Sequence, residues 1–84
     1  MNILVVNAGS STIKFNFFKM KNSEHFISIA SGVVSHIGEE NSKFKFFANE
    51  NNVELQTKFD THEQGIECFL KYLKIFRIRV SKGY

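Results

Sequence analysis

Residues 7–14 hold the side chains of this sequence that are best suited to chemistry. An amide, a glycine, three hydroxyls and an ammonium group fall within one octet, Asn7-Ala8-Gly9-Ser10-Ser11-Thr12-Ile13-Lys14. A turn built from such residues can present several backbone N–H groups and hydroxyls to one anion, and concavities of this kind bind phosphate. Lys14 would add a cation against the phosphate oxygens. The alternative interpretation is an ordinary hairpin turn with a solvated lysine.

The octet differs from the two commonest phosphate-binding loops. The Walker loop needs Gly-x-x-x-x-Gly-Lys-Ser/Thr at the start of a helix, and the dinucleotide-binding loop needs Gly-x-Gly-x-x-Gly; the sequence contains neither. Here a strand is expected on each side of the turn. A phosphate site in this chain would therefore belong to a strand-turn-strand unit.

Two strands are expected to position the octet. Residues 2–6 contain a run of Ile, Leu and Val without alternation, which predicts a strand buried on both faces. Residues 7–11 suit a tight turn, the candidate phosphate turn. Apolar and polar side chains alternate along residues 12–20, which predicts a second, half-exposed strand.

Further along the chain the pattern predicts one more strand, a hairpin and a helix. Residues 25–36 are rich in β-branched side chains and predict a third antiparallel strand. Residues 43–59 predict a peripheral hairpin around the turn-like segment Asn49–Asn52. The helix is expected at residues 61–76, where the capping-box pattern of residues 60–64 starts it. Its apolar stripe, which should lie on the sheet, consists of Ile66, Phe69, Leu70, Leu73 and Phe76.

Length and composition indicate a single α+β domain and exclude several classes of protein. A chain of 84 residues holds one small domain. No apolar run reaches the roughly 18 residues that a transmembrane helix needs, and the first residues lack an export signal. One cysteine, Cys68, excludes an internal disulfide. We therefore expect a cytoplasmic protein without membrane contact.

The remaining polar and aromatic residues are interpreted structurally. The histidines (His25, His36 and His62) have no acid or cysteine partner at metal-ligand spacing, so surface or capping roles are expected. Cys68 is expected to pack beside the helix stripe. The strand phenylalanines (Phe15, Phe17, Phe18, Phe44, Phe46 and Phe47) favour a core over a base-stacking platform, because no RNA-recognition motif accompanies them. The basic residues after Glu67 suit a helix C-terminus, with nucleic-acid binding as the less favoured alternative.

The octet closely resembles the N-terminal signature of the acetate kinase family, which includes acetate and propionate kinases. That signature runs Asn-Ala-Gly-Ser-Ser-Ser-x-Lys after a hydrophobic strand. Two further segments are similar to the family, Ala30-Ser31-Gly32-Val33-Val34 with Ile37-Gly38, and His62-Glu63-Gln64-Gly65. The resemblance covers about residues 1–75.

The resemblance implies a fold and an activity. The fold would be the N-terminal part of an acetate and sugar kinase, Hsc70 and actin domain, which is ribonuclease H-like and begins with three antiparallel strands and a helix. The activity would be transfer of the γ-phosphoryl group of ATP to acetate with Mg²⁺, giving ADP and acetyl phosphate.

Roles are carried over residue by residue from the signature. Asn7 matches the asparagine associated with magnesium and the transferring phosphoryl group, and Lys14 matches the lysine associated with ATP. The nucleotide- and phosphate-binding positions are Gly9, Ser10, Ser11, Thr12 and Lys14. Thr12 replaces the usual serine; it keeps the hydroxyl and adds a methyl group.

The resemblance also implies substrate arginines, a catalytic aspartate, a transition-state histidine and an adenine pocket, all beyond residue 84. We therefore expect an N-terminal fragment without turnover of its own, since phosphoryl transfer needs charge neutralisation from several directions. The alternative is a non-enzymatic module that binds phosphate, a nucleotide or another subunit. Exposed apolar surface and free sheet edges predict a homo-oligomer.

Overall fold

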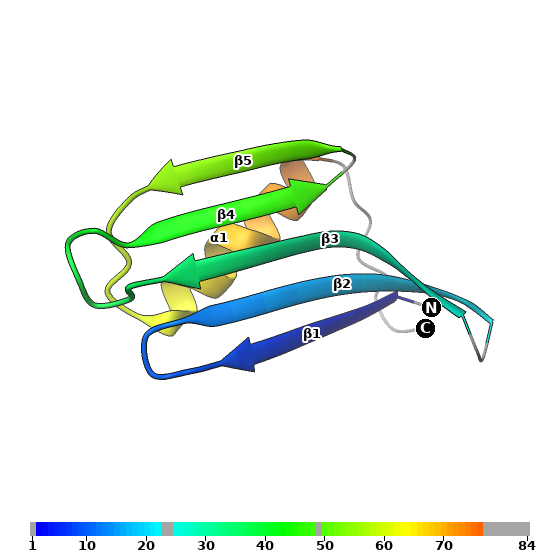
Figure 1. Ribbon diagram of the computed structural model, residues 1–84, viewed down its shortest axis with the longest axis horizontal. Helices are drawn as coiled ribbons and strands as arrows, with labels where there is room; N and C mark the ends of the chain where they lie inside the picture. The colour runs from blue at the N-terminus through cyan, green and yellow to red at the C-terminus, as the bar shows by residue number, and fades with distance from the viewer. Residues whose placement is uncertain (1, 23–24, 49, 77–84) are drawn as a thin grey trace.

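The computed structural model describes residues 2–22, 25–48 and 50–76, and within these ranges the chain forms five strands followed by one helix (Figure 1). The elements are β1 (Asn2–Ala8), β2 (Ile13–Asn22), β3 (His25–Ser35), β4 (Lys43–Ala48), β5 (Asn51–Gln56) and α1 (His62–Ile75). The expected α+β class is confirmed.

The five strands form one antiparallel sheet in the order β1-β2-β3-β4-β5, so each strand pairs with its neighbour in sequence. Helix α1 packs on one face of this sheet, against β2, β3 and β4 (Figure 1). We call this the helix face and the opposite side the open face. Side chains alternate between faces along a strand, and directly paired residues share a face. Lys14 and Asn16, which alternate with the buried Phe15, therefore lie on the open face.

The core between sheet and helix is aromatic. The Phe69 ring stacks on Phe15 with 4.4 Å between the ring centroids and 5° between the ring planes, and Phe46 lies 5.5 Å from Phe69. Gly32 permits this contact, because a Cβ there would come within 2.9 Å of Phe69 Cδ1 and 3.0 Å of the Lys45 carbonyl oxygen. Aromatic pairs contribute about 0.5–1.5 kcal/mol each beyond their buried area. The position of α1 therefore depends on a glycine in the strand beneath it.

The start of α1 follows the expected capping pattern. Thr61 is the N-cap, and its side chain accepts a 3.3 Å hydrogen bond from the backbone N–H of Gln64. The Gln64 side-chain oxygen accepts a 2.7 Å hydrogen bond from the N–H of Asp60, one residue before the cap. The first bond satisfies a backbone donor that the first turn leaves free, and the second satisfies the N–H just before the cap. Asp60 and Thr61 are thereby held against the first turn of the helix.

The predicted helix stripe is correct in part. Phe69 and Leu73 are buried, and Ile66 and Phe76 are half-buried against the core. Leu70 was expected on the sheet, but it is 38% exposed. It follows Phe69 directly and so projects about 100° around the helix from that buried ring.

The expectation that the first strand is buried on both faces is wrong. β1 lies at the edge of the sheet, and its side chains Val5 and Val6 are 38% and 40% exposed. The physical reason is the placement of α1, which covers the middle strands. The strand is also longer than the expected residues 2–6, since Asn7 and Ala8 still pair with β2.

The strands of the hairpin were expected at the periphery of the sheet, and this is correct for β5 but wrong for β4. β5 is the second edge of the sheet, whereas β4 lies between β3 and β5 and buries Phe44 and Phe46 beneath α1. Among the predicted core phenylalanines, two are exceptions. Phe47 is 47% exposed because it alternates with Phe46 and faces the open side. Phe18 is half-buried and lies outside the core cluster, with its ring 6.5 Å from that of the exposed Phe26.

Several boundaries differ slightly from the predicted ones. The second strand was expected at residues 12–20 and is found at Ile13–Asn22, and the third ends at Ser35 rather than at residue 36. Ala48 pairs directly with Asn51, so the hairpin connection is shorter than expected. Of the basic residues after Glu67, those from Arg77 onward lie outside the described residues.

Candidate functional site

The turn between β1 and β2 is closed by its own backbone and held from two other segments. The N–H of Gly9 donates a 2.7 Å hydrogen bond to the Thr12 carbonyl. The N–H of Ile37 donates a 2.9 Å bond to the Ser11 carbonyl, and His62 Nε2 donates a 2.7 Å bond to the Gly9 carbonyl. The candidate phosphate turn is thus connected both to the β3–β4 loop and to the first residue of α1.

Position 9 has no room for a side chain, and glycine has none. A Cβ at Gly9 would approach Thr12 Oγ1 to 2.9 Å, closer than real Cβ contacts allow. The turn therefore places the Thr12 hydroxyl directly beside the Gly9 backbone. The Thr12 hydroxyl oxygen lies at this point of closest approach.

The hydroxyls of the turn have no partner within the described part of the chain. Ser10 is exposed, and Ser11 and Thr12 are half-buried. Their side chains, and the N–H groups of Ser10 and Ser11, make no hydrogen bond to any described residue. These donors and acceptors are therefore available to a ligand.

Asn7 and Lys14 face each other across the turn. They are direct partners in the β1–β2 register, so both side chains lie on the open face, and both are exposed. The sequence places them seven residues apart, and the hairpin brings them together on neighbouring strands about 5 Å apart. All six candidate site residues therefore lie at one end of the first hairpin.

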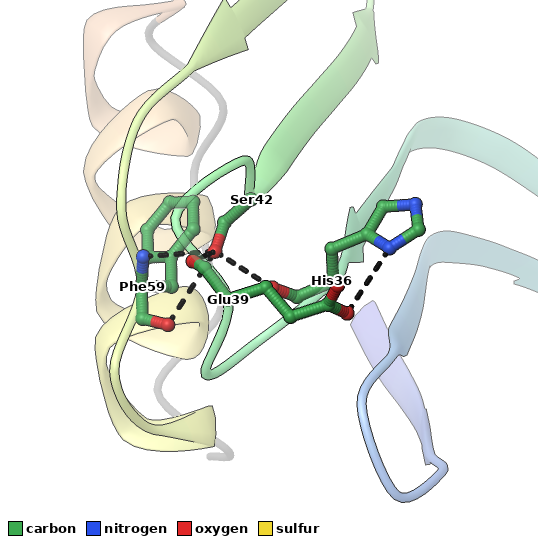
Figure 2. Close-up of polar contacts among 4 residues, drawn as sticks. All are labelled: His36, Glu39, Ser42 and Phe59. Carbon is green, nitrogen blue, oxygen red and sulfur yellow. Dashed lines mark hydrogen bonds and ion pairs between the residues drawn. The ribbon is translucent and has the colours of Figure 1, made fainter.

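A buried serine, which the sequence analysis missed, organises the loops beside this turn. Figure 2 shows Ser42 between the β3–β4 loop and the segment that leads to α1. Its Oγ lies 2.8 Å from the His36 carbonyl and 3.0 Å from the Glu39 carbonyl, and it accepts a 3.1 Å hydrogen bond from the Phe59 N–H. The side chain is fully buried. A serine before an alternating strand carries no local sequence signal for this role.

The loops at this end of the sheet are linked in a ring. The Gly38 N–H donates a 2.7 Å hydrogen bond to the Phe59 carbonyl, which joins the β3–β4 loop to the segment before α1. This bond, together with the Ile37 and His62 bonds, links the turn, the β3–β4 loop and the beginning of the helix to one another. The backbone of the candidate phosphate turn is consequently fixed before any ligand binds.

Two histidines make contacts that the sequence did not indicate. His36 lies at the surface, as expected, and its Nδ1 lies 3.2 Å from Glu39 Oε2. Both side chains are more than half exposed, so this ion pair contributes little to stability. His62 was expected at the surface or as a cap, and instead connects the helix to the turn.

No cluster of three His, Cys, Asp or Glu side chains that could hold a metal ion occurs in the ranges 2–22, 25–48 and 50–76. A Mg²⁺ ion usually keeps several waters and shares its coordination with the phosphates of its nucleotide. The Asn7 amide oxygen, exposed beside the turn, fits that mode as a single hard oxygen ligand. The same ranges contain no helix with the length and apolarity needed to cross a bilayer.

A family model and the curated relatives of this chain indicate the same family. Residues 2–83 match the family model described as the Acetokinase family. An acetate kinase of Campylobacter jejuni is 46% identical over 76 residues, and one of Sulfurimonas denitrificans is 37% identical over 78 residues. These alignments cover 88% and 93% of this chain but 18% and 19% of the relatives. The chain thus spans under a fifth of the length of these relatives and matches their N-terminal region.

Proposed function

The chain belongs to the acetokinase family, and on that premise we propose that it carries the phosphate-binding turn of an acetate kinase-like phosphotransferase. The reaction of the intact protein would be ATP and acetate to ADP and acetyl phosphate. The observation that carries the proposal is the placement of Asn7 opposite Lys14 beside a turn with unpaired hydroxyls.

Each part of the turn has a role in holding the phosphates. The hydroxyls and N–H groups of Ser10 and Ser11 donate to phosphate oxygens, and Thr12 adds a third hydroxyl. The Lys14 ammonium lowers the repulsion between the phosphate charges. Asn7 would offer its amide oxygen to the Mg²⁺ that accompanies ATP; when bound, the ion neutralises charge on the phosphates. Since the hydrogen bonds described above fix the turn, little ordering is needed when the nucleotide binds.

We propose that the 84-residue chain by itself binds MgATP but does not catalyse phosphoryl transfer. One turn with one lysine neutralises the transferring group from one side only. Titration with MgATP, followed by NMR, tests binding: amide signals of residues 7–14 should shift and saturate. If those signals do not move, the turn does not bind the nucleotide.

A separate assay tests turnover. The pure chain, given ATP, Mg²⁺ and acetate, should form no acetyl phosphate above the background. Formation that scales with the concentration of the chain would contradict this part of the proposal and favour an enzyme over a binding module. The proposed location is the cytoplasm, where a single free cysteine remains reduced.

Self-association is the second part of the proposal. The outer edge of β1 carries no charged residue, and its Val5 and Val6 side chains are exposed. Uncharged, exposed edges pair readily with further strands. We expect a homo-oligomer in light scattering at micromolar concentration, and a monodisperse monomer would contradict it.

A further inference from the structure

One row of side chains crosses the whole open face. The register pairs Lys14 with Val33, Val33 with Lys45, and Lys45 with Glu54. With Asn7 opposite Lys14, the row runs from β1 to β5. Because directly paired residues share a face, all five side chains lie opposite α1. Lys14 thus has a second lysine near it, from a strand that the phosphate turn does not include.

A hollow of about 560 Å³ lies over this part of the open face. Its volume falls within the range of small-molecule pockets. The residues that line it come from β2, β3, β4 and β5, and those with polar side chains are Lys14, Asn16, Ser31, Lys45, Asn52 and Glu54. Phe47 adds an aromatic ring on the same face.

The two lysines are free to bind an anion. Among the described residues the ion pairs are His36 with Glu39 and Lys58 with Asp60, so neither Lys14 nor Lys45 is paired. Their backbones are two strand spacings apart, about 10 Å, a span that two extended lysine side chains can close from either side. Glu54 also lines the hollow, on the far side of Lys45 from Lys14. A ligand between the lysines therefore meets cations first.

The next row supplies hydrogen-bond donors and an apolar wall. Asn16 pairs with Ser31, Ser31 with Phe47, and Phe47 with Asn52, which places an amide, a hydroxyl, a ring and a second amide side by side. Phe47 is 47% exposed, although a ring of this size is usually buried. Convergent polar groups beside an apolar surface are the usual lining of a small-molecule site.

We propose that this hollow binds a small phosphate-bearing ligand, with Lys14 and Lys45 as its cations and Asn16, Ser31 and Asn52 as hydrogen-bond donors. This goes beyond the proposed function, which assigns phosphate to residues 7–14 alone. The two sites share Lys14, while Lys45 belongs to the hollow only.

The first test is a titration of the 84-residue chain with pyrophosphate, without metal, followed by NMR. The amide signals of Lys45 and Phe47 should shift along one saturable curve. Shifts confined to Gly9–Ser11 would overturn the inference and leave the phosphate turn intact. Shifts confined to the hollow would support the inference and count against the turn. No shift at Lys45 and Phe47 at any concentration would overturn it.

The second test compares two variants of one strand. Lys45→Gln should weaken pyrophosphate binding about threefold to fivefold, as expected for one exposed charge pair. Lys43→Gln is the matched control: Lys43 is exposed on the same face of β4, carries the same charge, and does not line the hollow. It should leave the affinity unchanged. Equal weakening by both would show general attraction to a basic protein and overturn the site.

Both substitutions are at exposed side chains, so each variant should keep the dispersed NMR spectrum of the parent chain. If one of the variants loses its dispersed spectrum, the titration of the unsubstituted chain alone tests whether the hollow binds pyrophosphate. Acetate serves as the comparison anion, because a monovalent carboxylate cannot engage both lysines as pyrophosphate does. Acetate binding at the hollow with the same affinity would contradict a preference for phosphate.

Discussion

His62 Nε2 donates a 2.7 Å hydrogen bond to the carbonyl oxygen of Gly9, a residue 53 positions earlier in the chain. A carbonyl can only accept, so the histidine must carry its proton on Nε2 in this arrangement. The bond connects the first residue of α1 to the turn between β1 and β2. The helix start and the candidate phosphate turn are therefore positioned together.

Replacing His62 by alanine should loosen the turn. We expect the free energy of unfolding to fall by about 0.5–1.5 kcal/mol, the usual net value of one hydrogen bond. Hydrogen exchange of the amides from Gly9 to Thr12 should become faster. His25→Ala is the control, because the described bonds of His25 reach only Asn22. Unchanged exchange in the turn of the His62 variant would show that this bond does not hold it.

Gly32→Ala should be strongly destabilising for so small a change. The added Cβ would meet the Phe69 ring at 2.9 Å and the Lys45 carbonyl at 3.0 Å, and the backbone atom cannot move aside cheaply. Overpacking of this kind costs about 1–3 kcal/mol. Urea unfolding should show a lower midpoint, whereas Ser28→Ala, at an exposed position of the same strand, should leave it nearly unchanged. Equal midpoints would mean that α1 can shift without cost.

Ser42→Ala should disconnect the β3–β4 loop from the segment before α1. The substitution removes the acceptor of the Phe59 N–H and the hydroxyl beside the His36 carbonyl. Leaving such buried groups unpaired costs about 1–3 kcal/mol. Thermal or urea unfolding measures this loss. A variant as stable as the parent would indicate that water replaces the hydroxyl.

The reactivity of Cys68 should be low at neutral pH. Burial raises the pKa of its thiol, and the positive charge of Lys71 opposes this only in part. The thiolate is the reactive form, so a raised pKa leaves less of it near pH 7. Alkylation by iodoacetamide should be slower in the folded chain than in urea, and its rate should keep rising above the pH at which an ordinary cysteine levels off.

Lys71→Gln tests whether the charge of Lys71 lowers the pKa of the Cys68 thiol. Removing the positive charge should slow alkylation of Cys68 further, because the opposing influence on the thiol pKa is lost. Lys58→Gln, on the segment before the helix, should not change the rate. Identical rates in the folded and unfolded chain would contradict burial as the dominant influence.

Local sequence was sufficient for much of the fold. Alternation of Phe15 and Phe17 with polar neighbours predicted β2, and the capping residues around Thr61 predicted the start of α1, because both patterns depend on residues close in sequence. The same logic failed for Leu70 and Phe47. Each is apolar and close to a buried residue, but its exposure depends on which face the sheet and helix share.

The candidate site was predictable only in its composition. The octet identified the residues of the turn, and its resemblance to one family indicated phosphate chemistry. Nothing local indicated that His62 would bond to Gly9, or that Ser42 would hold Phe59, since these partners lie 53 and 17 positions apart. A single sequence has no periodic signal for such contacts.

By itself the sequence determined which segments become strands and helix and which octet holds the turn between the first two strands, because backbone preference and side-chain alternation act over a few residues. The tertiary structure alone decided that Asn7 faces Lys14 and that Lys45 lies in the same row, because register depends on how whole strands pair. It also decided that β1 is an exposed edge, since α1 packs across the middle of the sheet.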